Sequence, residues 1–162
     1  MNRALICACM LDFAGNAFAG APVLSATSYG QVVFGDRLEH VEARLKEKAP
    51  PPAEWDEPGC RLIEFATYPG MVFMVGGGVV TRGETSLPIK TSLGVSVGAS
   101  LKVVRDKVPR IVVSPHQYDE SGHYLTMQTR DGKAAIVMEE TGGKVTEVRG
   151  GFIPCQSMAA GA

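Results

Sequence analysis

An internal repeat is the feature of this 162-residue chain that most restricts its fold. Two pairs of segments carry glycine and apolar residues in the same order, at nearly constant offsets of 63 and 65 residues. The matched pairs are 34–41 with 97–104 and 77–81 with 142–146. A chance match in a glycine-rich chain is the alternative, but the shared order favours two copies of one unit. The copies span about 28–88 and 91–153.

Each copy is expected to contain a short helix followed by an antiparallel β-meander. Leu38, Val41 and Leu45 recur at helical spacing, and Asp36 stands at the expected N-cap. The corresponding helix of the second copy is expected at 100–107. Strands are predicted at 60–67, 71–76 and 79–84, and then at 110–114, 123–129, 134–140 and 144–149.

The turns between these strands favour hairpins. Asp131-Gly132 is a strong hairpin signal, and Gly142-Gly143 forms another tight turn, whereas parallel crossovers need a dozen or more residues. We therefore predict an α+β fold in which two repeats form an antiparallel sheet with the helices packed on one sheet face. The whole of 20–162 is expected to form a single domain.

The first nineteen residues resemble an export signal. Arg3 precedes the apolar stretch 4–11, and Ala17-Phe18-Ala19 is a cleavage site of the A-x-A type. This pattern predicts a signal peptide at 1–19 and a periplasmic or secreted protein. A misassigned start, a tail and a lipoprotein anchored through Cys9 are the alternatives. The apolar stretch is shorter than the roughly 20 residues needed to span a bilayer, so no stable membrane span is expected.

Cleavage after Ala19 would leave two cysteines, Cys60 and Cys155. Two cysteines in an exported chain allow one intramolecular pairing, so we predict a disulfide between them. Closing a loop of this length would stabilise the fold by up to about 4–5 kcal/mol on the chain-entropy model. Two free buried thiols are the alternative, and they would suit a protein kept in the cytosol.

Charge and motifs exclude several classes of function. Lys and Arg total 16 against 17 Asp and Glu, and without a basic run this balance argues against a nucleic-acid partner. The stretch Gly94-Val95-Ser96-Val97-Gly98 has the G-x-S-x-G spacing, but we assign its serine to a turn beside the repeat glycines rather than to a nucleophile elbow. Neither a phosphate loop nor a C-x-x-C pair occurs in the chain. We therefore nominate no catalytic residue, no cofactor and no metal-ligand set.

The segment 116–124 is where an enzyme or metal hypothesis has to be placed. It contains His116 and His123 together with Asp119 and Glu120, and imidazole and carboxylate groups suit zinc or copper. Their spacing fixes no third ligand, so a polar turn leading into a strand at His123 is the competing interpretation. A small hydrolase would require a deep pocket that holds both histidines and a carboxylate.

A binding surface is the leading interpretation. On the strand 123–129, Tyr124 and Gln128 share the face predicted to be exposed, and Leu125 lies on the opposite, core face. We name Tyr124, Gln128, His116 and Trp55 as candidate binding residues, because exposed aromatic and amide groups anchor partners. Trp55, the single tryptophan, either anchors a partner at the rim or covers the core.

The two helix starts, Gly35-Asp36-Arg37-Leu38 and Gly98-Ala99-Ser100-Leu101, carry a family resemblance together with the meander expected after each. The repeated unit resembles the tandem β-lactamase-inhibitor-protein-like architecture, which is shared with small outer-membrane assembly lipoproteins. The stretches 116–126 and 142–146 also resemble an uncharacterised group of exported bacterial proteins. Members of the inhibitor-like group bind proteins through an exposed sheet face.

The resemblance therefore implies a non-enzymatic binding protein that recognises another envelope or secreted protein, as an inhibitor or an assembly accessory. A lectin-like protein that binds glycans through Tyr124, Gln128, His116 and Trp55 is the alternative. A small hydrolase is the third class.

Overall fold

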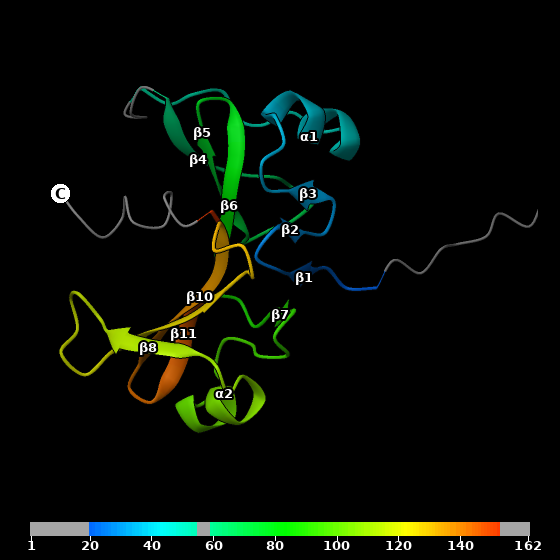
Figure 1. Cartoon of the computed structure of the whole chain (residues 1–162). Helices are drawn as coiled ribbons and strands as arrows, with labels where there is room; N and C mark the ends of the chain where they lie inside the picture. The colour runs from blue at the N-terminus through cyan, green and yellow to red at the C-terminus, as the bar shows by residue number, and fades with distance from the viewer. Residues whose placement is uncertain (1–19, 55–58, 153–162) are drawn as a thin grey trace, which may run out of the picture.

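The computed structural model describes residues 20–54 and 59–152, and its strands form two sheets (Figure 1). The small sheet has four two-residue strands in the order β3-β2-β1-β7. They are β1 (Val23–Leu24), β2 (Ser28–Tyr29), β3 (Val32–Val33) and β7 (Lys90–Thr91). Strand β1 pairs antiparallel with β2 and parallel with β7.

The large sheet has seven antiparallel strands in the order β4-β5-β6-β11-β10-β9-β8. The strands are β4 (Cys60–Glu64), β5 (Val72–Gly76), β6 (Val79–Thr85), β8 (Val112–Pro115), β9 (His123–Gln128), β10 (Ala134–Thr141) and β11 (Lys144–Phe152). Strands β4, β5 and β6 form one half of this sheet, and β8 to β11 form the other. The two halves meet where β6 pairs with β11.

The predicted α+β fold of repeated helix plus meander is wrong. Of the described residues, 42% lie in strands and 12% in helices, and the strands form separate sheets of four and seven strands. The small sheet covers one face of the large sheet, and helices α1 (Leu38–Leu45) and α2 (Leu101–Lys107) lie toward its two ends (Figure 1). No helix in the described ranges is long and apolar enough to cross a membrane.

The N-cap predicted for the first helix is also wrong. Arg37 occupies the N-cap of α1 without a side-chain capping bond, because the carboxylate of Asp36 accepts a hydrogen bond from Arg44 instead, at 2.5 Å. The second helix begins as expected, since the hydroxyl of Ser100 accepts a hydrogen bond from the Val103 N–H at 3.3 Å.

Both helix starts are attached to the large sheet by equivalent hydrogen bonds. The N–H of Gly35 donates to the carbonyl of Val80 at 2.7 Å, and the N–H of Gly98 donates to the carbonyl of Val145 at 2.7 Å. Val80 and Val145 are the second residues of β6 and β11. The two helices are thus fixed to the two strands that meet at the centre of the sheet.

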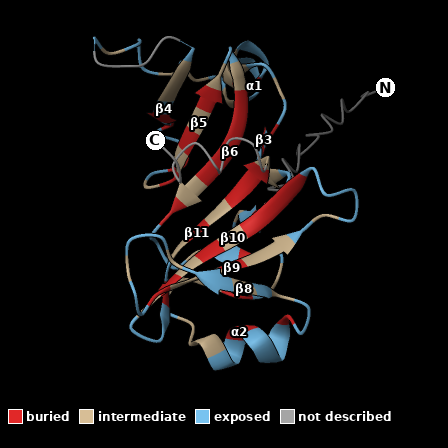
Figure 2. Cartoon of the chain, turned by 60° about the vertical axis from the view of Figure 1, so that its left-hand side comes forward, coloured by how far each residue is buried: buried red, intermediate tan, exposed pale blue. Residues whose placement is uncertain are grey.

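The two sheets pack together over the junction of β6 and β11. Gly83 faces Gly150 across this junction, and a Cβ atom at Gly150 would lie only 2.1 Å from the carbonyl oxygen of Ser25. The small sheet therefore rests directly on the backbone of β11. One apolar cluster fills the interface, and the buried residues run along the central strands of the large sheet (Figure 2).

Candidate binding surface

The face of the large sheet that lies opposite the small sheet is called the outer face below. Leu125 of β9 and Met138 of β10 are fully buried on the covered face, so the alternating residues Tyr124 and Gln128 point to the outer face. Thr126 lies between them on the same face. The face predicted for Tyr124 and Gln128 from alternation is confirmed.

His116 joins Tyr124 on the outer face. The imidazole stacks on the Tyr124 ring, with centroids 4.5 Å apart and an interplanar angle of 23°. Tyr118 meets the same imidazole edge-on at 6.3 Å and is 73% exposed. We call His116, Tyr118 and Tyr124 the aromatic platform.

The loop between β8 and β9 holds the platform in place. The backbone N–H groups of Tyr118 and Asp119 both donate to Nδ1 of His116 at 3.1 Å. Because Nδ1 accepts two hydrogen bonds, the imidazole proton lies on Nε2, which faces a carboxylate oxygen of Glu139 at 3.5 Å. The side chain of Asp119 accepts from Ser121, and this hydrogen bond lowers the pKa of the carboxyl. The platform is therefore preorganised by its own loop.

A network of buried charges continues from the platform across the outer face. Arg149 donates to Glu139 and to Glu147, the latter at 3.0 Å, and Arg82 lies 3.1 Å from a carboxylate oxygen of Glu84. The arginine side chains are only 11% and 4% exposed. Burial lowers the pKa of Arg149, while burial and the charge of Glu84 raise the pKa of Glu147. We call these five residues the charge network.

His123 does not join His116. It lies on the covered face, where its Nδ1 is 2.7 Å from a carboxylate oxygen of the buried Glu140. The two histidines thus pair with adjacent glutamates on opposite faces of β10. Among the described residues, no three His, Cys, Asp or Glu side chains are grouped to hold a metal ion. The pocket required for the hydrolase hypothesis, with both histidines and a carboxylate, is not formed by this pair.

The remaining predicted site residues do not converge on the platform. Gln128 is on the same face as Tyr124, but four residues along an extended strand separate the two by about 13 Å. Trp55 lies outside the described residues. Cys155 does so too, so the predicted disulfide with Cys60 is not tested, and the half-buried Cys60 begins β4.

A shallow groove of about 770 Å³ opens at the β8 edge of the outer face. Its lining residues are Arg110, Val112, Thr126, Met127, Gln128, Thr129 and Arg130. Gln128 is exposed here, and Val112 is 63% exposed. We call this groove the β9 notch. It brings Gln128 together with two arginines that the sequence analysis did not select.

The charge network was also missed. Its signal was present, because Arg82 and Glu84 alternate in β6 in the same way as Glu147 and Arg149 do in β11. Charged residues at alternating positions of two apolar strands indicate one polar face. What the pattern could not show was that these two strands are neighbours.

Comparisons of the chain with protein-family models, with curated proteins and with solved structures find no match in any of the three. The resemblance to inhibitor-like repeats therefore stays a prediction, and the function has to be argued from the outer face itself.

Proposed function

We propose that this chain is an exported, non-enzymatic binding protein that recognises another envelope or secreted protein through the outer face of its large sheet. The aromatic platform carries the proposal. It places a Tyr118 ring that is 73% exposed beside a stacked His116–Tyr124 pair on the outer face, next to Glu139 of the charge network. Exposed tyrosines of this kind are frequent anchors of protein interfaces.

The preorganisation of the outer face also supports recognition of a protein partner. Ordering an aromatic side chain or a loop on binding costs free energy, and this cost falls when the free protein already holds the binding conformation. Here the Nδ1 atom of His116 fixes the loop, and the charge network fixes the neighbouring side chains Glu139 and Arg149. A rigid face of this kind favours recognition of one partner shape.

Two further parts of the proposal, export and the disulfide, are supported by the sequence. The segment 1–19 has the features of a signal peptide, and cleavage after Ala19 leaves Cys60 and Cys155 as a single pair. An oxidising compartment would allow that pair to form. Both features suit a protein that acts in the bacterial envelope.

Site-specific photocrosslinking tests the proposal. The full chain is produced in a Gram-negative host with a benzophenone amino acid at Tyr118, and in a second strain at Val103, an exposed position of α2 outside the outer face. We expect a discrete protein adduct from Tyr118 and none from Val103. Equal adducts from both positions, or none from Tyr118, would contradict recognition of a protein through this face.

A glycan is the second candidate partner, and the exposed Tyr118 ring beside polar side chains is the observation that favours it. Sugars stack on aromatic rings and bond to neighbouring polar groups. In this case the photocrosslinker at Tyr118 would yield no protein adduct. Titration of isotope-labelled protein with a glycan panel would instead shift the amide resonances of Tyr118 and Tyr124.

A further inference from the structure

The β9 notch exists because β8 is shorter than the strand it pairs with. Strand β8 begins at Val112, opposite Thr126, and β9 continues beyond that pair to Gln128. The chain turns away before Val112, since the N–H of Ile111 donates to the carbonyl of Val108. Within the described residues, the end of β9 therefore forms a short edge that has no strand on its β8 side.

The main chain of Gln128 points into this notch. In an antiparallel ladder, successive residues bond to opposite neighbours. Thr129 bonds toward β10, because its N–H donates to the carbonyl of Ala134 at 2.8 Å, so Gln128 faces the β8 side. The position across from it belongs to Arg110, and no main-chain hydrogen bond joins these two residues within the described ranges. One donor and one acceptor are thus available at the edge.

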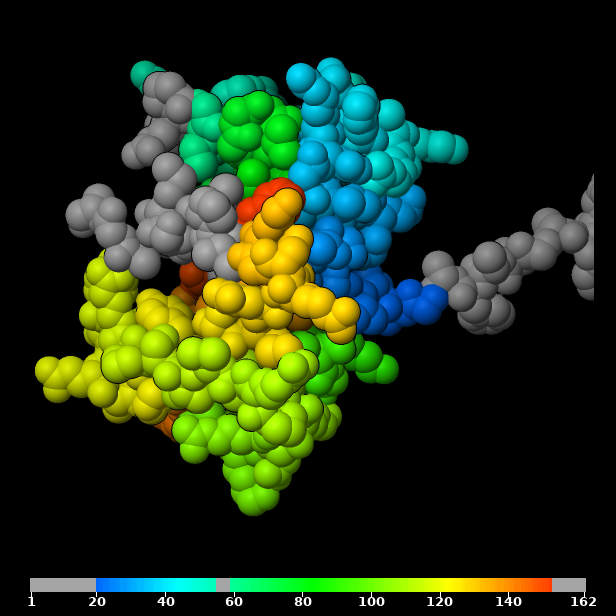
Figure 3. All heavy atoms as spheres, in the orientation of Figure 1, coloured from blue at the N-terminus to red at the C-terminus, as the bar shows by residue number. Residues whose placement is uncertain are grey.

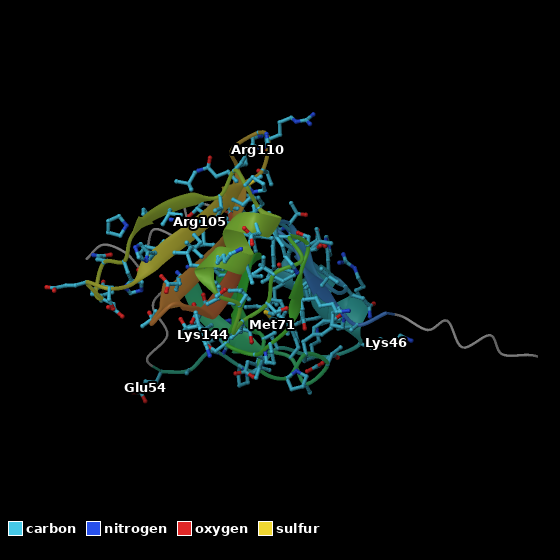
Figure 4. All side chains as sticks on the ribbon, turned by 90° about the horizontal axis from the view of Figure 1, so that it is seen from below. Lys46, Glu54, Met71, Arg105, Arg110 and Lys144 are labelled. Atoms are coloured by element: carbon cyan, nitrogen blue, oxygen red, sulfur yellow. The ribbon has the colours of Figure 1, made fainter. Side chains whose placement is uncertain are left out.

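Two guanidinium groups flank these main-chain groups. Arg110 and Arg130 both line the notch, and neither makes an ion pair with any described residue. The nearest carboxylate in sequence, Asp131, is already engaged by the hydroxyl of Thr129 at 2.6 Å and by the N–H of Lys133 at 3.2 Å. Arg110 lies at the rim of the molecule, where a partner can reach it (Figure 4). The notch therefore carries positive charge that none of its described lining residues neutralises.

Apolar surface completes the notch. Val112 is exposed on the outer face, and the half-buried Met127, whose side chain packs against the core, also lines the notch. An available strand edge between apolar side chains and cations suits an extended peptide, since main-chain pairing gives affinity and flanking groups select side chains. The β9–β10 turn that carries Arg130 lies on the molecular surface, in yellow to orange (Figure 3).

We propose that the β9 notch binds an extended acidic segment of the protein partner, which pairs with the main chain of Gln128 and places carboxylates against Arg110 and Arg130. This inference rests on the proposed function and specifies the chemistry of the partner. Two arginines and one strand edge match a short acidic peptide, whereas a nucleic acid would need a longer track of cations. Arginine is also suited to carboxylates, because its planar fork bonds both oxygens.

Titration with defined peptides tests the inference. The isotope-labelled full chain is titrated with acetyl-Glu-Val-Glu-Val-Glu-amide and with acetyl-Lys-Val-Lys-Val-Lys-amide as the reversed-charge probe. We expect only the acidic peptide to shift the amide resonances of Gln128 and Thr129, and to bind less tightly as salt is raised. The double variant Arg110→Ala/Arg130→Ala should weaken this binding by about tenfold or more.

A matched control distinguishes peptide binding at the notch from attraction of the peptide to positive charge elsewhere on the surface. Arg105→Ala/Lys144→Ala removes the same two positive charges from exposed positions outside the notch (Figure 4). We expect this control to bind the acidic peptide as the native chain does. Loss of binding in both double variants, equal binding of the lysine peptide, or no shift at Gln128 would each overturn the inference.

The two proposals fail in different ways. If the peptide does not bind the notch while the photocrosslinker at Tyr118 still yields its adduct, recognition of a protein stands and the chemistry assigned to the notch is wrong. If Tyr118 yields no adduct and Gln128 does not shift, the proposed function and the inference fall together.

Discussion

At the scale of single residues, the charge network is the most unusual feature of the outer face. Arg82 and Arg149 are almost entirely buried, although removing a guanidinium from water costs several kcal/mol unless carboxylates compensate it. Glu84, Glu139 and Glu147 supply that compensation. Such a network contributes little net stability, but it fixes the side chains of the face in one arrangement.

Glu147 makes the pH dependence of this network testable. Burial and the nearby charge of Glu84 raise the pKa of Glu147 above its ordinary 4.5, with Arg82 opposing them in part. The native state therefore binds this proton more tightly than the unfolded chain does, so stability falls as pH rises through the window above 4.5. Glu147→Gln should remove that loss. In urea unfolding, the free energy of unfolding of this variant relative to that of the native chain should therefore rise from pH 4.5 to pH 7.

The control for this prediction is Glu39→Gln on α1, where the side chain is 68% exposed. It removes the same charge from the surface, so its difference from the native chain should stay nearly constant over the same pH range. If Glu147→Gln behaved in the same way as Glu39→Gln, the raised pKa of Glu147 would not affect stability.

The positions of candidate site residues could be predicted where they depend on a single strand. Strict alternation along β9 was enough to assign Tyr124 and Gln128 to the outer face. The stacking of His116 on Tyr124 depends on the loop conformation, and the network of Arg149 with Arg82 and Glu84 depends on the pairing of β6 with β11. Strand pairing between distant segments leaves no local periodicity in the sequence.

At the scale of elements, the β6–β11 junction decides how the two sheets meet. Gly150→Ala would place a methyl group 2.1 Å from the carbonyl oxygen of Ser25, which belongs to backbone that cannot rotate away. The small sheet would have to move off the large sheet. We expect a loss of about 2–3 kcal/mol in the free energy of unfolding, measured in urea, because such overpacking costs this much in cores.

Gly76→Ala is the matched control, since Gly76 also lies in a strand of the large sheet. The nearest atom to its added Cβ is Cγ2 of Thr81 at 3.7 Å, an ordinary contact. We expect a change of less than about 1 kcal/mol. Equal losses for Gly76→Ala and Gly150→Ala would mean that packing of the small sheet on Gly150 is not what makes that glycine necessary.

Strands could be predicted where the turn residues and the alternation of apolar residues indicate the same bounds. Strand β9 was expected at 123–129 and is His123–Gln128, and β10 was expected at 134–140 and is Ala134–Thr141. The small sheet was not predicted, because a two-residue strand such as β1 or β7 shows no alternation. The parallel pairing of Val23–Leu24 with Lys90–Thr91 also joins segments far apart in the chain.

At the scale of the whole molecule, one apolar core links the two ends of the large sheet. The cluster includes Val41 of α1 and Val104 of α2, both fully buried, although the helices lie at opposite ends of the molecule (Figures 1 and 2). Strands β6 and β11 join the two halves of the sheet, and the small sheet bridges them. A continuous core of this kind unfolds as one cooperative unit.

We therefore expect Val41→Ala and Val104→Ala each to lower the free energy of unfolding by about 2 kcal/mol. Because the two sites are far apart, their effects should add in the double variant, and urea unfolding followed by circular dichroism should remain a single transition. Val103→Ala, at a 39% exposed position of the same helix as Val104, should change stability by less than about 0.5 kcal/mol. If either valine variant split the unfolding curve into two transitions, the halves of the sheet would be separate folding units, and binding on the outer face could not stabilise the far end of the molecule.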